Sequence, residues 1–150
     1  MPESQLPSEK IQRLMAFDFG TKRIGIAVGQ RLTGTGEPLS PIKANDGIPN
    51  WQELERIINT WNPDAFVVGL PLNMDGTPSS MSARANKFAK RLEGRYHRRA
   101  FTHDERLSSF EAKGYVMAQG GSRDFGKNSV DGLAAQLVLE SWMAEHPLHS

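Results

Sequence analysis

Hydrophobic residues first become dense at position 14, and two runs follow that are mostly apolar, aromatic or β-branched. They cover residues 14–19 and 23–28, with the turn-forming sequence Gly-Thr-Lys between them. Two such runs around a short turn are typical of a β-hairpin. Residues 38–43 are expected to form a third, peripheral strand, because Pro38 and Pro41 cannot occupy a central ladder.

The next apolar pattern has the period of an amphipathic helix. Asn50, a residue type that caps helix N-termini, precedes it. Its apolar face comprises Trp51, Leu54, Ile57, Ile58 and Trp61. Pro63 ends this helix, and the unbroken apolar run 65–70 predicts a strand that is covered on both faces.

The remaining sequence predicts three helices, a strand and two loops. The loop 71–80 precedes a helix whose apolar face comprises Ala85, Phe88, Ala89, Leu92 and Tyr96. A strand over 98–102, a helix over 108–118 and a mobile loop over 119–129 come next. The clearest helical period closes the chain, at Val130, Leu133, Ala134, Leu137, Val138 and Trp142. Three early strands followed by alternating strands and helices predict an α/β domain with a mixed sheet.

The sequence has 150 residues, which suits one domain. We expect residues 1–12 to be a flexible lead-in and residues 13–150 to form the domain. No run approaches the ~18 apolar residues of a membrane helix, and the first residues lack an apolar signal core, so we expect a cytoplasmic protein. Cysteine is absent, which excludes disulfides and thiolate metal sites. The net charge of +1 is too balanced to indicate nucleic-acid binding by itself.

Asp18 interrupts an otherwise apolar strand, where a carboxylate is costly to bury without a partner. It either bonds the backbone of the turn at Gly20 or acts as a metal ligand or acid–base group at the end of the strand. Lys22 and Arg23 follow in a flexible segment that can approach phosphate.

Further acidic residues stand where strands give way to helices. Asp104 and Glu105 follow the predicted strand 98–102, and Asp131 lies in the first turn of the closing helix. Each of them can simply cap a helix. Small residues after Asp131 would let that helix approach the sheet closely, and three converging carboxylates would bind a hard cation such as Mg²⁺.

Other polar residues are candidates for contacts with nucleic acid. Asn73 lies in the loop after the strand 65–70, where it either makes a turn or faces the site. The second helix carries a cationic stripe at Arg84, Lys87, Arg91 and Arg95. Residues 84–99 contain seven Lys or Arg and one acid, which favours a surface for phosphates over a merely solvated face.

Four segments, in this order, resemble the YqgF family. They are residues 17–28 (FDFGTKRIGIAV), 67–77 (VVGLPLNMDGT), 104–108 (DERLS) and 130–135 (VDGLAA). The family comprises small bacterial RuvC-like proteins regarded as Holliday-junction resolvases and as nucleases that process the 5′ end of pre-16S ribosomal RNA. The resemblance implies a ribonuclease-H-like fold with a mixed five-stranded sheet flanked by helices.

The resemblance also maps the family's acidic active-site positions onto Asp18, Glu105 and Asp131, and so favours Glu105 over Asp104. Relatives often keep a basic residue close to the last of these positions. Here Lys127 stands slightly further upstream, and it is a candidate for contacting nucleic acid.

Together these features predict a nuclease that uses Mg²⁺ or Mn²⁺ held by the three acids and acts on structured RNA, with pre-16S rRNA as the substrate. One alternative is a resolvase of branched DNA, which would need a dimer with two sites. Another is an RNA-binding assembly factor on the same fold without catalysis. A nucleotide-binding role is disfavoured, because ATPases with a similar Asp-x-Gly-Thr loop need two such lobes. Either a monomer or a homodimer is compatible with the sequence.

Overall fold

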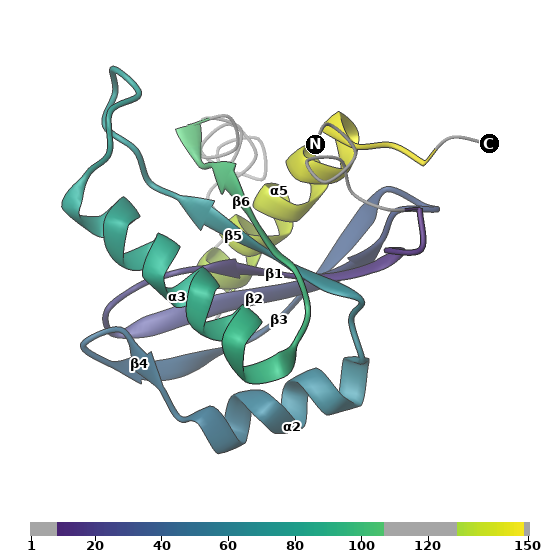
Figure 1. Cartoon of the computed structure of the whole chain (residues 1–150), viewed down its shortest axis with the longest axis horizontal. Helices are drawn as coiled ribbons and strands as arrows, with labels where there is room; N and C mark the ends of the chain where they lie inside the picture. Colours follow the sequence, from purple (N-terminus) through teal and green to yellow (C-terminus); the bar gives the residue numbers. More distant parts are fainter. Residues whose placement is uncertain (1–8, 107–128, 149–150) are drawn as a thin grey trace.

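The computed structural model describes residues 9–106 and 129–148, and for residues 129–131 it describes the backbone alone (Figure 1). The elements in chain order are β1 (Arg13–Asp18), β2 (Arg23–Gln30), β3 (Thr35–Asn45), β4 (Ile48–Pro49), α2 (Trp51–Trp61), β5 (Ala65–Leu70), α3 (Ser80–Tyr96), β6 (Ala100–Asp104) and α5 (Ser129–Glu145). The predicted helix 108–118 and loop 119–129 lie outside the described residues, apart from Ser129, which begins α5. So does most of the predicted lead-in 1–12.

The strands form one sheet in the order β4-β3-β2-β1-β5-β6. β1 to β4 are joined as antiparallel neighbours, whereas β5 and β6 run parallel to β1. The predicted mixed sheet is therefore confirmed, with one addition: the two-residue β4, which the sequence analysis did not predict. It pairs with β3 across Asp46 and Gly47, and both residues have positive φ, as a two-residue hairpin turn requires.

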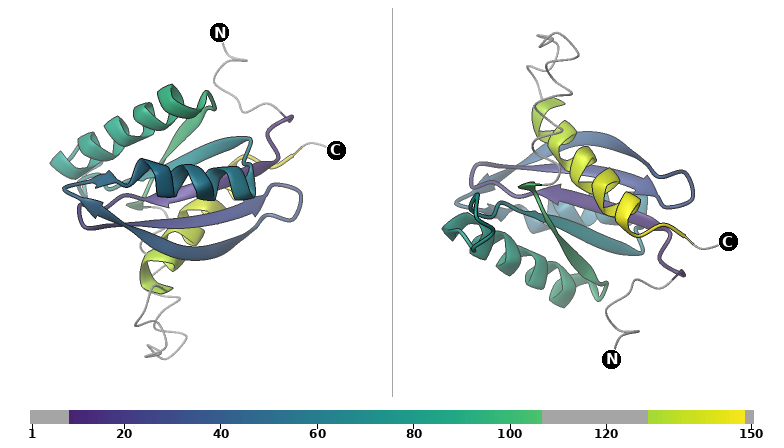
Figure 2. Two further views of the ribbon diagram at one scale, coloured as in Figure 1. Left: turned by 90° about the horizontal axis from the view of Figure 1, so that it is seen from below. Right: turned by 90° about the horizontal axis from the view of Figure 1, so that it is seen from above.

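Three layers result, with α2 and α3 on one face of the sheet and α5 on the other (Figure 2). The α2–α3 face is filled by large side chains, among them Phe17, Phe66 and Phe88. The α5 face has smaller sheet residues, such as Ala16 and Ala27, against Trp142. Alternate residues of the buried strands thus face opposite layers, as expected for a sheet that is covered on both sides.

Local signals set the ends of the helices. The side chain of Asn50 accepts hydrogen bonds from the backbone N–H groups of Gln52 and Glu53, at 3.0 and 3.1 Å. Ser79 and Ser82 form a reciprocal capping box at the start of α3. The residue that follows this helix, His97, has a left-handed φ of 57°, and β6 begins two residues later than the predicted strand.

The helix α5 is hydrogen-bonded to the β2–β3 hairpin near the turn that joins its two strands. The backbone N–H of Gly36 donates to the Glu140 carboxylate at 2.8 Å, and the Gln136 amide donates to the Gly36 carbonyl at 2.9 Å. None of the helices in the described ranges is long and apolar enough to cross a membrane.

Candidate active site

Three parallel strands bring residues from distant parts of the sequence to one edge of the sheet. β1 ends at Asp18, β5 at Leu70 and β6 at Asp104, with β5 between the other two. Glu105 follows β6 directly, and its backbone N–H donates to the carbonyl oxygen of Leu70 at 2.9 Å. Carboxyl ends of parallel strands are where sheets of this kind gather functional residues.

Gly69 provides the space in which Asp18 and Glu105 approach each other. The register pairs Phe17 with Val68, so Gly69 is the next β5 residue beside Asp18. A Cβ atom added to Gly69 would lie 2.6 Å from Oε2 and 2.7 Å from Cγ of Glu105. The Glu105 side chain therefore lies over the bare backbone of β5 and reaches across it toward β1.

The two carboxyl groups perturb each other strongly. Burial is the largest of the causes that raise the pKa of Glu105 to about 9, and the negative charge of Asp18 and a hydrogen bond with Asp18 act in the same direction. Two carboxyl groups this close cannot both ionise at ordinary cost. At neutral pH the pair therefore holds a proton on Glu105 when no cation is bound.

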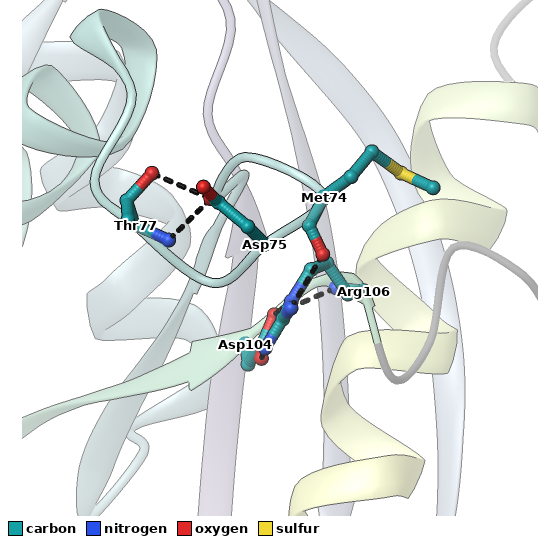
Figure 3. A network of polar contacts seen from close by, with 5 residues as sticks. All are labelled: Met74, Asp75, Thr77, Asp104 and Arg106. Carbon is teal, nitrogen blue, oxygen red and sulfur yellow. Dashed lines mark hydrogen bonds and ion pairs between the residues drawn. The ribbon is translucent and has the colours of Figure 1, made fainter.

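Asp104, the neighbour of Glu105, has a different environment (Figure 3). Its carboxylate binds the guanidinium of Arg106, with Nη2 to Oδ2 at 2.7 Å and Nε to Oδ2 at 3.0 Å, and this pairing lowers the pKa of Asp104. The same guanidinium donates through Nη1 to the carbonyl oxygen of Met74 at 3.0 Å. Asp104 is thus engaged in holding a loop, whereas Glu105 faces Asp18.

The held loop, residues 71–79, carries the predicted site residue Asn73. Its amide donates to the Thr77 hydroxyl at 3.0 Å and to the Pro78 carbonyl at 3.1 Å. Asp75 accepts from the Thr77 hydroxyl at 2.6 Å, and this bond lowers the pKa of Asp75. Asn73 thus makes the local turn that was one of its two predicted roles, Asp75 stabilises the same turn, and Met74 is 93% exposed at the tip.

Part of the cationic stripe of α3 lines a cleft on the α2–α3 side of the sheet. Arg84, Lys87 and Arg91 line a cleft of about 220 Å³ together with Phe19, the residue that follows Asp18. We call this the phosphate cleft. Arg84 also donates through Nη2 to the carbonyl and the carboxylate of Asp46, at 2.7 and 3.0 Å, which ties the hairpin turn to α3.

Lys22 and Arg23 lie at the start of β2 and are exposed. The carbonyl of Lys22 accepts from the N–H of Ala44 at 2.8 Å, and the Thr21 carbonyl accepts from the N–H of Gly47 at 2.9 Å. The turn that follows Asp18 is therefore fastened to β3 and the hairpin beside the phosphate cleft.

Asp131 lies in the first turn of α5, and its side chain is not among the described atoms. A Cβ on the next residue, Gly132, would lie 2.9 Å from the Pro38 side chain and 3.0 Å from the Leu39 carbonyl, so the predicted close approach of this helix to the sheet occurs on β3. Lys127 lies outside the described residues. Within the described ranges, no three His, Cys, Asp or Glu residues form a group able to hold a metal ion.

Comparison with known protein families shows to which family the chain belongs. The family described as "RuvX: Holliday junction resolvase" matches residues 12–145. The chain belongs to the RuvX family. RuvX is the YqgF family that the four motifs resemble, so that prediction is confirmed.

Curated RuvX relatives are similar over almost their whole length. A protein of Marinobacter nauticus is 58% identical over 140 residues, which cover 93% of this chain and 98% of the relative. A protein of Azotobacter vinelandii is 55% identical over 134 residues, which cover 89% and 94%. Both are named "Putative pre-16S rRNA nuclease". These names agree with the predicted hydrolase of phosphodiester bonds.

Solved structures share the fold at low sequence identity. Thermus thermophilus RuvC, in complex with a Holliday junction substrate, has a TM-score of 0.55 and 12% identity, with 90% of this chain and 95% of that chain covered. The fowlpox virus Holliday junction resolvase has a TM-score of 0.53 and 15% identity, with 89% and 99% covered. The predicted ribonuclease-H-like fold of this RuvX chain is thereby confirmed.

Three contributors to the site were missed by sequence reasoning. Arg106 pairs with Asp104, Gly69 makes room for Glu105, and Asp46 binds Arg84. The Asp-Gly dipeptide at 46–47 was an available signal, because it is typical of tight hairpin turns. For Gly69 no signal existed, since its role depends on which strand lies on each side of β5.

Proposed function

We propose that this RuvX chain is a metal-dependent endonuclease that cleaves structured RNA, with the 5′ end of pre-16S rRNA as its substrate. The observation that carries the proposal is the carboxyl pair of Asp18 and Glu105, which meets over the bare backbone of Gly69 at the carboxyl edge of the sheet. The names of the curated relatives support the choice of substrate.

The donor set fits a hard divalent cation. Two carboxyl groups from different strands converge, and each makes the other costly to ionise, an arrangement that a cation with oxygen ligands would relieve. We propose that Asp18, Glu105 and Asp131 would hold Mg²⁺ or Mn²⁺. When bound, such an ion would polarise the scissile phosphate and lower the pKa of a water molecule.

The chain's own residues would orient the substrate and keep the carboxyl groups in place. The bond from the Glu105 backbone to Leu70 fixes where the side chain leaves β6. Arg106 directly follows Glu105 in the sequence, but its guanidinium pairs with the carboxylate of Asp104. Arg106 therefore does not neutralise the charge of the carboxyl pair. Protein groups that are fixed before substrate arrives need no reorganisation during the reaction.

The phosphate cleft would bind the backbone of the RNA. Lys22, Arg23, Arg84, Lys87, Arg91 and Arg95 are the cations that we assign to nucleic-acid contact. Arg84, Lys87 and Arg91 line this cleft together with Phe19, so a strand bound there would pass the end of β1. Contacts by Asn73 and Lys127 stay predictions, as do the cytoplasmic location and the oligomeric state.

The test is a direct comparison of substrates. Purified protein is incubated with pre-16S rRNA and with four-way DNA junctions, each with Mg²⁺, Mn²⁺ or EDTA, beside an Asp18→Asn variant. The proposal expects cleavage of the RNA that needs the metal and Asp18. RNA binding that survives the loss of all three acids, with no cleavage under any condition, would instead identify an assembly factor.

The family's description favours one second candidate, a resolvase of branched DNA. In that case the junction would be cut in preference to the RNA, by a dimer with two sites. Sedimentation of the protein with and without the junction would distinguish the two functions.

A further inference from the structure

A second cleft opens where the start of α2 meets the end of α3. Its volume is about 330 Å³, and Trp51, Arg91, Gly94 and Arg95 line it. We call it the tryptophan cleft. Arg91 also lines the phosphate cleft, so the two clefts are neighbours on α3. From Arg84 to Arg95 the helix rises by about 16 Å, which makes one continuous cationic path that begins beside Phe19.

Trp51 is held in place but remains partly exposed. Its indole stacks on Phe88 of the core, with centroids 6.2 Å apart and an interplanar angle of 21°. The Cζ atom of Arg95 lies 4.0 Å from the centroid of the same indole. Trp51 thus joins a rigid aromatic layer to the planar guanidinium of Arg95 at the surface, and the outer face of such a guanidinium is one on which a base can stack.

The floor of the tryptophan cleft is empty of side-chain atoms at Gly94. A Cβ atom added there would meet no atom within 4 Å apart from its chain neighbours and the backbone of its own helix. The only acid within residues 84–99, Glu93, directs its carboxylate to the backbone N–H of Ala100 at 2.9 Å. The cleft therefore combines open space, an aromatic ring and two arginines, without an acid of α3 among its lining residues.

We propose that the tryptophan cleft binds an unpaired nucleobase whose flanking phosphate lies in the phosphate cleft. The inference rests on the proposed function and narrows it: the enzyme recognises a single-stranded segment of its RNA substrate. A base in a duplex is already stacked and paired, so a duplex would offer only phosphates to this surface. Stacking on aromatic residues and arginine tolerates every base, so recognition depends on strandedness and not on sequence.

Fluorescence provides the first test, because the chain has only three tryptophans and two of them lie on α2. A single-stranded RNA oligonucleotide is titrated in EDTA, so that binding is observed without cleavage. We expect it to quench the fluorescence of the wild type and of Trp61→Phe, and to leave that of Trp51→Phe unchanged. Trp61 is the matched control, since it lies on the same helix and is 39% exposed.

The second test fills the cleft without changing a charge. Gly94→Leu should weaken binding of the single strand about tenfold and leave binding of the same strand with abasic sites unchanged, whereas Gly94→Ala should bind both almost as the wild type does. Either side chain replaces a helical glycine in open space, so the melting temperature should hold or rise.

Several results would overturn the inference. They are equal affinity of the wild type for the intact and abasic strands, preference for a duplex, unchanged binding by Gly94→Leu, or no binding at all. The proposed function is judged separately by cleavage. Cleavage of pre-16S rRNA by a protein that fails the base test refutes only this inference, and base-dependent binding without cleavage refutes only the nuclease.

Discussion

The carboxyl pair and the phosphate cleft are both polar, yet they are built in opposite ways. Asp18 and Glu105 are fixed by the backbones of β1 and β6, the two strands that flank β5, and the Oε2 atom of Glu105 is buried. Lys87 and Arg91 are exposed side chains on one helix. Burial removes the water that would otherwise screen charges from each other, whereas exposure leaves them weakly coupled. A single substitution should therefore abolish the function of the carboxyl pair. The phosphate cleft should lose affinity for nucleic acid in small steps, one substitution at a time.

The largest effect is expected from Asp18→Asn. Cleavage should fall by at least about a hundredfold, because a ligand charge is lost while the shape is nearly kept. Stability without metal should hold or improve, since repulsion within the pair is relieved. Cleavage rate and melting temperature, with and without Mg²⁺, check both expectations.

A matched control is Asp64, which directly precedes β5 and lies beside the opposite end of β1 from Asp18. Asp64 accepts hydrogen bonds from the backbone N–H groups of Gln12 and Arg13, both at 2.9 Å. Asp64→Asn should lower stability by about 1 kcal/mol and leave cleavage intact below the melting transition. Full Mg²⁺-dependent cleavage by Asp18→Asn would show that the proposed site is wrong.

Gly69→Ala should damage the site without damaging the fold. The new Cβ atom would overlap Glu105, whose flexible side chain can move away more easily than the strands can. We expect cleavage to drop about tenfold or more, with a small change in melting temperature. Gly94→Ala is the comparison, because its Cβ atom meets nothing. Equal cleavage by both alanine variants would mean that Glu105 needs no fixed position.

The next effect is a pH dependence of stability in EDTA. The pKa of Glu105 is raised from 4.5 to about 9 on folding, so the folded protein binds this proton more tightly than the unfolded chain does. The associated stability is present below pH 4.5 and is lost as the pH rises from there toward 9. Glu105→Gln should remove this loss, so its melting temperature should exceed that of the wild type by a margin that grows between pH 5 and pH 9. A constant margin would contradict the raised pKa.

The smallest effect per residue is expected in the phosphate cleft. Changing Arg84 and Arg91 together to Glu should weaken RNA binding for all sequences and reduce the slope of log K against log salt by about two. Arg84 should contribute less than Arg91, because Asp46 already pairs with it. Arg56→Glu, an exposed change on α2 outside both clefts, is the control. An unchanged salt slope in the double variant would show that Arg84 and Arg91 do not contact phosphates and that α3 presents an ordinary solvated face.

Much of the fold could be predicted because its signals are local. The helix over residues 51–61 and the strand over residues 65–70 have the predicted bounds, since a cap, a proline and an unbroken apolar run mark them. β4 escaped notice because two residues carry no periodic pattern. The start of β6 was misplaced by two residues, because the left-handed conformation of His97 delays the strand.

The candidate site was predictable only in part. The sequence predicts Asp18 and Glu105 at one edge of the sheet, because both residues stand at strand ends. The contact between them did not follow, because it needs the register of β5 with both neighbours and the missing side chain of Gly69. Asp104 and Glu105 are adjacent in sequence, and only the pairing of Asp104 with Arg106 distinguishes their surroundings. The role of Asp131 stays a prediction.

The attachment of α5 to the β2–β3 hairpin also has a kinetic consequence. The bonds that join Gly36 to Gln136 and Glu140 close sequence separations of 100 and 104 residues. Closing a long loop costs more entropy than joining neighbouring elements, so contacts of this range form late in folding. We expect refolding to build the α2–α3 face first and to dock α5 afterwards. The chain would then pass through a state in which the small residues of the other sheet face, such as Ala16 and Ala27, are still exposed to water.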